Sequence, residues 1–214
     1  MSAKGLNDFE RALAGILGEK KLAAIQKVKI GIAGAGGLGS NCALFLVRSG
    51  FKKFRIVDFD VVEYSNLNRQ FYFADQVGRR KVDALKENLL RINPDLEIET
   101  LPEKIEQENV HKLFTCCDVV VEALDKACYK KLVAEAYLCS GKLLVAASGL
   151  AGWGKSDGVK IHQVKERFYL VGDLVSEVEP GRPALAPGVS VAAAKQADVV
   201  LNYVVGRLEG YSIP

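Results

Sequence analysis

A length of 214 residues suits one well-buried α/β domain and is short for two. Hydrophobic residues make up 49% and charged residues 26% of the chain, which is ordinary globular composition. The net charge of +3 includes no long basic tract, so the sequence does not predict a nucleic-acid-binding protein. Residues 1–26 carry charges throughout, and no apolar run is long enough for a membrane span. We therefore expect a cytoplasmic protein with neither a signal peptide nor a membrane span.

The five cysteines are Cys42, Cys116, Cys117, Cys128 and Cys139. Their odd number and the lack of a CxxC pair predict neither a disulfide framework nor a four-cysteine zinc site. We expect Cys42 and Cys139 to pack as small apolar groups on helices. Cys116 and Cys117 stand where a predicted helix gives way to a strand, and a redox or sulfur-handling role stays open for them.

The first predicted element is an amphipathic helical arm within residues 1–26. Apolar residues recur there at helical spacing, and Gly15 and Gly18 interrupt the pattern. The apolar positions are Phe9, Leu13, Ile16 and Leu17. The arm contains a single arginine, Arg11.

A glycine-rich turn follows at residues 34–39, between two apolar runs, in the order strand, turn, helix. Such a turn visits positive φ, and a phosphate approaches the backbone closely only where no Cβ intervenes. The predicted nucleotide-binding glycines are Gly34, Gly36, Gly37 and Gly39. Asp58 ends the next β-branched run, at the place where an acidic side chain accepts a ribose hydroxyl. These features predict a nucleotide site without naming the nucleotide.

A dense polar loop, FDVVEYSNLNRQ at residues 59–70, comes directly after the second predicted strand. The helix after it has apolar residues at helical spacing and ends near residue 93. Arg79, Arg80 and Lys81 stand at its N-terminus, where three cations oppose the helix dipole and repel one another. An anionic ligand at Lys81 would relieve that repulsion, and we expect Arg79 and Arg80 to face solvent.

The largely apolar run at residues 118–124 predicts a buried central strand. Asp125 follows it, at the edge where open α/β sheets bind ligands. A carboxylate at this place is suited to hold magnesium, or to cap the helix that begins near Lys126. Both roles stay open.

The glycine-rich segment 148–154 either lines a substrate channel or forms a tight loop anchored by Trp153. Residues 172–188 carry three prolines and no helical period, so we predict a long functional or mobile loop. The other predicted elements are strands at 96–101 and 143–147, a short helix at 107–114, a hairpin of 159–164 with 167–171, and an apolar helix at 189–206.

Two segments together resemble the ThiF/MoeB/HesA family, adenylyltransferases related to the activating enzymes of ubiquitin. GAGGLGS at 34–40 matches the family's GxGGLGS, and DFDVVEYSNLNRQ at 58–70 matches DxDxVExSNLNRQ. Within the family, the chain resembles the short ThiF sulfur-carrier-protein adenylyltransferases of thiamine biosynthesis. The resemblance implies one domain over residues 1–214, with a Rossmann-like, doubly wound, mostly parallel sheet, helices on both faces and an antiparallel C-terminal extension.

The resemblance also implies ATP and Mg²⁺ as cofactors. Arg69, Lys81 and Asp125 would be catalytic, with Mg²⁺ on Asp125, and Arg11 would reach the nucleotide site of a second subunit in a homodimer. The nucleotide-binding residues implied beside the glycines are Asp58, Asp60, Asn66, Arg69 and Lys81. The alternatives are that Arg11 is simply solvated and that Asn66 and Arg69 belong to a surface loop pinned by internal hydrogen bonds.

The function implied is ATP-dependent adenylylation of the C-terminal glycine of a small ubiquitin-like sulfur carrier. Other substrates of the same chemistry, such as the molybdopterin-synthase carrier or a tRNA carboxylate, stay open, as do a nicotinamide-dependent oxidoreductase and a nucleotide-binding regulator without turnover. Residues 172–188 correspond to the family's crossover loop. Ser176 stands there where many members carry a cysteine, the zinc-binding CxxC pairs are missing, and Lys126 replaces a usual asparagine.

Overall fold

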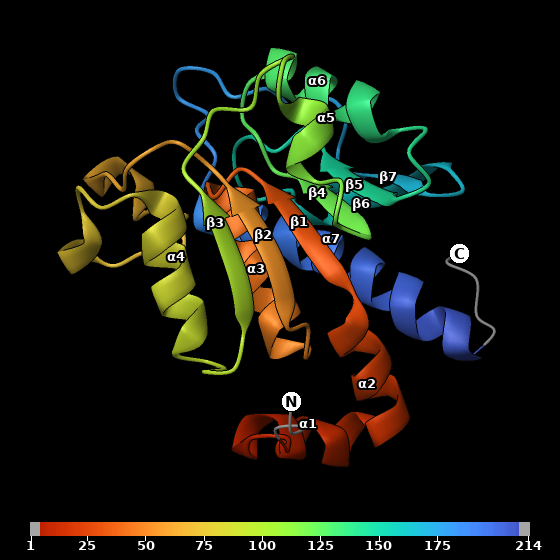
Figure 1. Cartoon of the computed structure of the whole chain (residues 1–214). Coiled ribbons are helices and arrows are strands. Elements are labelled where there is room, and N and C mark those ends of the chain that lie inside the picture. The colour runs from red at the N-terminus through yellow and green to blue at the C-terminus, as the bar shows by residue number, and fades with distance from the viewer. Residues whose placement is uncertain (1–4, 210–214) are drawn as a thin grey trace.

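The computed structural model of the chain describes residues 5–209 (Figure 1). Its helices and strands alternate through most of the chain. In chain order they are α1 (Asp8–Leu17), α2 (Glu19–Lys27), β1 (Lys29–Ala33), α3 (Gly37–Arg48), β2 (Lys53–Val57), α4 (Lys81–Leu90), β3 (Glu97–Leu101), α5 (Val110–Leu113), β4 (Val119–Glu122), α6 (Ala127–Tyr137), β5 (Leu143–Ala147), β6 (Lys160–Lys165), β7 (Phe168–Gly172) and α7 (Ala186–Glu209). Three short 3₁₀ helices, η1 (Tyr64–Asn66), η2 (Ala74–Gln76) and η3 (Ser156–Gly158), lie in the connections.

The strands form one seven-stranded sheet in the order β3-β2-β1-β4-β5-β7-β6. Every pair from β3 to β7 is parallel, and β6 runs antiparallel to β7. Parallel neighbours need crossover connections, which the alternating helices supply. The predicted Rossmann-like, mostly parallel sheet with an antiparallel extension near the C-terminus is confirmed.

Helices cover both faces of this sheet. Val119 and Val121 of β4 pack in an apolar cluster with α3, α4 and α7, whereas Val120 packs in a second cluster with α5 and α6. Every residue of β4 and β5 is buried, as expected for strands covered on both faces. In Figure 1, α5 and α6 lie together on one side of the sheet.

Several predicted boundaries shift in the structure. The arm divides at Gly18, whose φ of +86° ends α1 and lets α2 start in a new direction. The short helix covers only residues 110–113. The last helix begins earlier than predicted, at Ala186, because Pro187 is tolerated in a first turn, where its missing N–H has no helical partner in any case.

The cysteines only partly follow the prediction. Cys42 is buried on α3, and burial raises the pKa of its thiol. The prediction for Cys139 is wrong, because α6 ends at Tyr137 and Cys139 is exposed in the turn beyond it. Of the adjacent pair, Cys116 is exposed and Cys117 is buried. None of the helices in residues 5–209 is both long and apolar enough to span a membrane.

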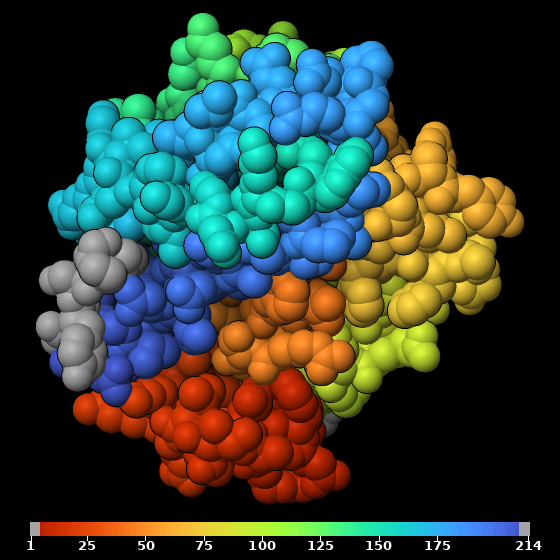
Figure 2. Space-filling view, turned by 180° about the vertical axis from the view of Figure 1, so that it is seen from behind, coloured from red at the N-terminus to blue at the C-terminus, as the bar shows by residue number. Residues whose placement is uncertain are grey.

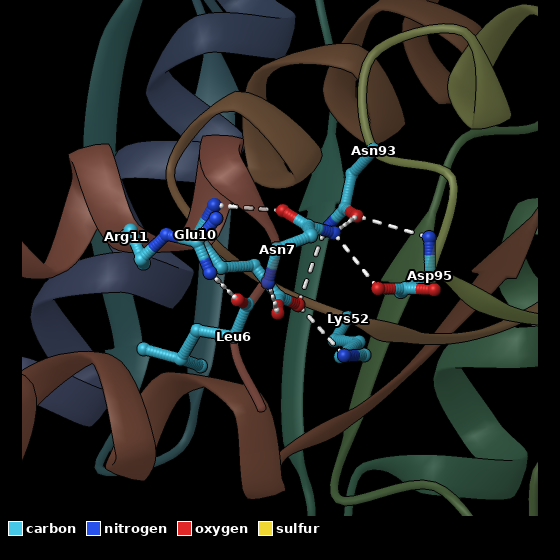
Figure 3. A network of polar contacts seen from close by, with 7 residues as sticks. All are labelled: Leu6, Asn7, Glu10, Arg11, Lys52, Asn93 and Asp95. Atoms are coloured by element: carbon cyan, nitrogen blue, oxygen red, sulfur yellow. Dashed lines mark hydrogen bonds and ion pairs between the residues drawn. The ribbon is translucent and has the colours of Figure 1, made fainter. Parts of the chain in front are cut away.

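A polar network fixes the arm to the rest of the chain (Figure 3). Glu10 is only 1% exposed, and its carboxylate accepts a hydrogen bond from Lys52 Nζ at 2.7 Å. Asn7 caps α1 by accepting from Glu10 N–H, and its side-chain amide donates to Asn93 and Asp95 at 2.8 and 3.0 Å. A buried carboxylate without a partner is costly, so the Glu10–Lys52 pair sets where the arm lies.

This anchorage places the arm at one particular edge of the sheet. Lys52 directly precedes β2, and Asn93 and Asp95 lie in the turn that leads into β3. The arm therefore covers the N-terminal ends of the parallel strands. In Figure 2 it lies at the bottom of the molecule, while the segment before α7 lies at the top.

We expect Glu10→Ala to lower the free energy of unfolding by about 2 kcal/mol, because it removes the cap partner of Asn7 and leaves Lys52 without its acceptor. Urea unfolding measures this loss. The control, Lys20→Ala on the exposed side of α2, should change the value by no more than about 0.5 kcal/mol. Equal unfolding midpoints for the two variants would contradict the anchoring role of Glu10.

Candidate nucleotide-binding site

The glycine turn joins β1 to α3 and is held by its own packing. Gly34 has a φ of +98°, and a Cβ there would lie 2.9 Å from the Ala123 carbonyl oxygen. A Cβ on Gly39 would overlap the carbonyl oxygen of Gly34. Glycine at these two positions is therefore required by the backbone of the turn, with or without a ligand.

Gly36 is different, because the protein itself leaves room for a side chain there. Its φ is −81°, and an added Cβ would meet no atom closer than Gln70 Nε2 at 3.9 Å. The open space lies at the N-terminus of α3, which has no side-chain cap. The first N–H groups of a helix lack intrahelical acceptors and attract anions. Gly36 thus borders a cradle that fits a phosphate.

Gly37 begins α3 and is more crowded. A Cβ there would lie 3.0 Å from Val189 Cγ1 and 3.4 Å from Arg69 Cγ. The stem of Arg69 therefore rests against the glycine turn. Asn41 holds the two together, because its side-chain amide donates to the carbonyls of Gly37 and Arg69 at 2.7 and 2.8 Å.

Asp58 connects the glycine turn to the polar loop. Its carboxylate accepts the N–H groups of Ala35 at 2.6 Å and Asp60 at 2.8 Å. Burial raises the pKa of Asp58, and these hydrogen bonds and Lys81 only partly oppose the rise. Asp58 lies at the end of β2 beside the turn, as its predicted ribose contact requires.

Lys81 begins α4 and is only 6% exposed. Its ammonium lies 2.8 Å from Asp60 Oδ2, and its N–H donates to the Asp60 carbonyl at 2.9 Å. The exposed Arg79 and Arg80 pair with Glu87 and with Asp83, respectively. The predicted exposure of the two arginines is confirmed. The expectation that an anionic ligand is needed to relieve the repulsion among these three cations is corrected, because each already has an acidic partner within the chain.

Tyr72 is a residue of this site that the sequence did not point to. Its buried hydroxyl lies 2.7 Å from the Ala35 carbonyl oxygen and 3.3 Å from that of Lys81. Burial, with Asp58 and Asp60 nearby, raises the pKa of Tyr72 well above its usual value. Tyr72 therefore stays a neutral donor that ties the glycine turn to the start of α4.

Asn66 shapes the loop that carries Arg69. Its side-chain oxygen accepts the Glu63 N–H at 3.1 Å in a capping box around η1. The Arg69 guanidinium donates to Ser65 O at 3.2 Å and Asn68 Oδ1 at 2.7 Å. The internal hydrogen bonds of the alternative interpretation are thus present in the ligand-free chain, and contact of Asn66 and Arg69 with a nucleotide remains a proposal.

Gln70 was also overlooked, although it closes the polar motif. It is 9% exposed, and its Oε1 has no hydrogen-bond partner within residues 5–209. Its Nε2 is the atom closest to the open space at Gly36. An amide can turn either its oxygen or its nitrogen toward a ligand. An unsatisfied amide beside the cradle is a further feature that fits a bound nucleotide.

Asp125 lies at the same edge as the glycine turn. Ala33 of β1 is paired with Glu122 of β4, so the ends of the two strands are side by side. The Asp125 side chain is exposed and makes no hydrogen bond or ion pair with any residue that the structure describes. The N-cap of α6 is Lys126, without a side-chain cap, so the capping alternative for Asp125 is wrong.

The fit of magnesium to this edge follows from the donor set. In the described part of the chain, no cluster of three or more His, Cys, Asp or Glu could cage a metal ion. Magnesium commonly binds through one or two carboxylates together with substrate phosphates and water. Asp125, a free carboxylate beside a phosphate cradle, fits that mode.

The glycine-rich segment after β5 is joined to the long loop before α7. Ala151 N–H donates to Ser176 Oγ at 3.0 Å, and Gly152 N–H donates to the Pro183 carbonyl at 3.1 Å. Trp153 is 66% exposed, so its proposed role as a packing anchor is wrong. Both segments follow strands of the parallel set and lie at the edge that carries the cradle.

Arg11 is not brought to this edge. It is exposed on α1, where its guanidinium donates to the Leu6 carbonyl (Figure 3) and also pairs with Asp8. Because the arm covers the opposite ends of the strands, Arg11 cannot reach the glycine turn of its own chain. A role at the nucleotide site requires a second copy.

Two surface hollows lie elsewhere. One of about 420 Å³ lies on α4, and one of about 310 Å³ lies beside the β3 edge. Neither is lined by a predicted site residue. The candidate site is thus an open cradle at the sheet edge, defined by Gly36, Gln70, Lys81 and Asp125.

A glycine turn of this geometry at the carboxyl edge of a doubly wound sheet defines the class of Rossmann-like nucleotide-binding proteins. The family model described as "ThiF family" matches residues 9–211. The chain therefore belongs to the ThiF family, and the predicted family membership is confirmed.

The chain is similar to longer proteins over about two thirds of its length. It is 35% identical over 142 residues to "Adenylyltransferase and sulfurtransferase UBA4" of Candida glabrata, covering 66% of this chain and 32% of that protein. It is 36% identical over 137 residues to "Adenylyltransferase and sulfurtransferase MOCS3" of Anopheles gambiae, covering 64% and 30%. The chain thus spans about a third of the length of these relatives.

Solved structures share the fold. The E. coli tRNA N6-threonylcarbamoyladenosine dehydratase TcdA, in complex with ATP, aligns with a TM-score of 0.87 at 19% identity, covering 98% of this chain and 100% of that one. E. coli MccB with ATP aligns with a TM-score of 0.70 at 20% identity, covering 93% and 64%.

We predict opposite outcomes for alanine at two glycines of the turn. Gly36→Ala should fold with a melting temperature lowered by no more than about 3 °C, yet bind ATP at least about tenfold more weakly, because its methyl group enters the phosphate cradle. Gly39→Ala should destabilise the protein even without nucleotide. Thermal melting and ATP titration measure both effects. Wild-type ATP affinity in Gly36→Ala would place the phosphates elsewhere.

Proposed function

We propose that this chain is an ATP-dependent adenylyltransferase that activates a carboxylate by joining it to AMP with release of pyrophosphate. The observation that carries the proposal is the cradle at Gly36, which the protein leaves open, together with the buried cation of Lys81 at the start of α4, which Tyr72 ties to the glycine turn. The names of the UBA4 and MOCS3 relatives support it. ThiF family membership favours adenylyl transfer over the nicotinamide alternative.

Adenylyl transfer requires alignment and charge stabilisation more than a side-chain nucleophile. The carboxylate attacks the α-phosphorus while negative charge builds on the leaving pyrophosphate. The N–H groups at the start of α3 would hold phosphate oxygens, and Asp58 would accept a ribose hydroxyl. Arg69, whose stem rests against the glycine turn, is able to bind two phosphate oxygens at once.

Lys81 is prepared for this role by Asp60. The 2.8 Å ion pair fixes the position of the ammonium before any ligand arrives. Preorganised charge of this kind stabilises a transition state without reorganisation at the moment of reaction. Asp125 would hold magnesium, which when bound neutralises charge on the phosphates.

The proposed substrate is the C-terminal glycine of a small ubiquitin-like carrier protein. More specifically, the proposed carrier is a sulfur carrier of the thiamine-biosynthesis type. The loop that would face the carrier's tail carries Ser176 and no cysteine, so the proposal includes no sulfur transfer by that loop.

A tRNA carboxylate is the second candidate substrate. It is favoured by the likeness to TcdA, which extends over the whole of that chain. Both candidates use the same adenylylation step and differ in the acceptor.

We expect magnesium-dependent exchange of pyrophosphate into ATP that requires a carrier ending in Gly-Gly. A carrier lacking the last glycine serves as the control. Exchange with tRNA instead of the carrier would select the second candidate. ATP binding with no exchange in the presence of any carrier or tRNA would overturn the proposal and favour a nucleotide-binding regulator.

Lys81→Met and Asp125→Ala should each reduce this exchange by about 100-fold or more, because each removes a charge-stabilising group. Arg79→Met is the matched control for Lys81, since Arg79 lies two residues away and pairs on the surface with Glu87. It should retain nearly wild-type exchange. Wild-type rates in Lys81→Met would remove that residue from the mechanism.

We further propose a homodimer in which Arg11 enters the partner's site. Arg11→Ala and Lys81→Met would then each be inactive alone, and a mixed dimer would regain one complete site. Co-refolding the two variants in equal amounts should restore about a quarter of wild-type exchange, since half of the dimers are mixed and each has one working site. If a verified mixed dimer restored no exchange, Arg11 would not act in the nucleotide site of the partner subunit.

A further inference from the structure

The last residue of β4 is a buried carboxylate that the proposed chemistry does not use. Glu122 is 1% exposed and lies at the edge that carries the cradle. Its oxygens lie 3.0 and 3.1 Å from Lys130 Nζ on α6, and one of them accepts the Leu124 N–H at 2.7 Å. The other three residues of β4 are valines.

Stability alone does not explain this carboxylate. Taking an ion pair out of water costs about as much as the pair regains, and apolar replacements of buried pairs are often neutral or stabilising. Valine already fills the rest of the strand, so an apolar residue would also suit position 122. The specific contacts of Glu122 therefore call for another explanation.

Those contacts lie on both sides of the segment that carries Asp125. Ala123 N–H donates to the Ala33 carbonyl at 2.9 Å, and Leu124 N–H donates to Glu122. The Glu122–Lys130 pair then links the end of β4 to the first turns of α6, across a turn in which α6 has no side-chain cap. Asp125 itself makes no contact that would orient it within the described chain, so its direction is set by the backbone on either side.

We infer that Glu122, together with Lys130, is a positioning residue that holds the Asp125 carboxylate toward the nucleotide cradle before ligand binds. This inference rests on the proposed function, in which Asp125 meets Mg²⁺ and phosphates. A carboxylate fixed in advance binds magnesium without first ordering its turn, which is the advantage of a supported functional group.

Amide hydrogen exchange of the ligand-free protein tests the positioning directly. Glu122→Leu removes the acceptor of the Leu124 N–H and should speed exchange of the Leu124 amide by about tenfold. Glu122→Gln keeps an amide oxygen for that N–H and should retain part of the protection. Tyr137→Phe is the matched control, because it removes a buried polar group at the far end of α6, where the Tyr137 hydroxyl accepts the Phe114 N–H at 3.1 Å.

Magnesium-dependent ATP binding supplies the second measurement. Glu122→Leu should raise the Mg²⁺ concentration for half-maximal ATP binding by about tenfold, Glu122→Gln should raise it less, and Tyr137→Phe should leave it unchanged. Exchange of the Leu124 amide that is no faster in Glu122→Leu than in Tyr137→Phe would overturn the inference. Faster exchange with an unchanged Mg²⁺ requirement would also overturn it.

The two proposals fail in distinguishable ways. If the wild-type protein binds Mg²⁺ and ATP but activates no carboxylate, the proposed function fails while the Glu122 variants still decide the positioning role. If activation occurs normally in Glu122→Leu with the wild-type Mg²⁺ requirement, the positioning role fails and the proposed function stands.

Discussion

The parallel pairing of β1 with β2 and β4 is the constraint on which the rest of the structure depends. It brings the carboxyl ends of three strands to one edge, although they are far apart in the sequence. Gly34, Asp58 and Asp125 follow these three ends. Loops at such an edge are where open α/β sheets bind ligands, because strand ends splay apart there and helix N-termini point toward the gap. The remaining contacts adjust groups that the pairing has already brought together.

Buried or half-buried carboxylate–lysine pairs fix the positions of several groups at the two edges of the sheet. Asp60 holds the Lys81 ammonium at the start of α4, and Glu122 with Lys130 links β4 to α6 across the turn between them. Glu10 with Lys52 anchors the arm at the opposite edge. Each pair joins segments that are distant in sequence or lie on either side of a turn. Such pairs contribute more to a defined geometry than to net stability, because desolvation offsets their attraction.

The sequence predicted the fold well because its signals were local. Continuous apolar runs identified the buried strands, and the alternation of strands with helices specified a mostly parallel sheet. The turn at 34–39 was predictable because a tight strand-to-helix connection needs positive φ, as Gly34 shows. Family resemblance supplied Asn66, Arg69 and Lys81, which no periodic pattern would have selected.

What the sequence did not reveal depends on tertiary contacts. Gln70 and Tyr72 gain their importance from the glycine turn, which is some 30 residues earlier in the chain and reaches them only through folding. Glu122 reads as part of an apolar strand until its pairing with Lys130 on α6 is known. The sequence predicts that Cys139 packs on a helix, and one of two interpretations of residues 148–154 makes Trp153 a packing anchor, but both side chains are exposed.

The joining of the two loops near the cradle has a consequence for substrate selection. The N–H groups of Ala151 and Gly152 already have partners in the segment that contains Ser176 and Pro183. A peptide that lies along the same backbone must therefore displace a competitor that is part of the same chain and has a high effective concentration. Only a tail that contributes binding energy elsewhere, for example through a folded body attached to it, would win that competition. Short free peptides with the same terminal residues would bind more weakly because of this competition, without any steric barrier.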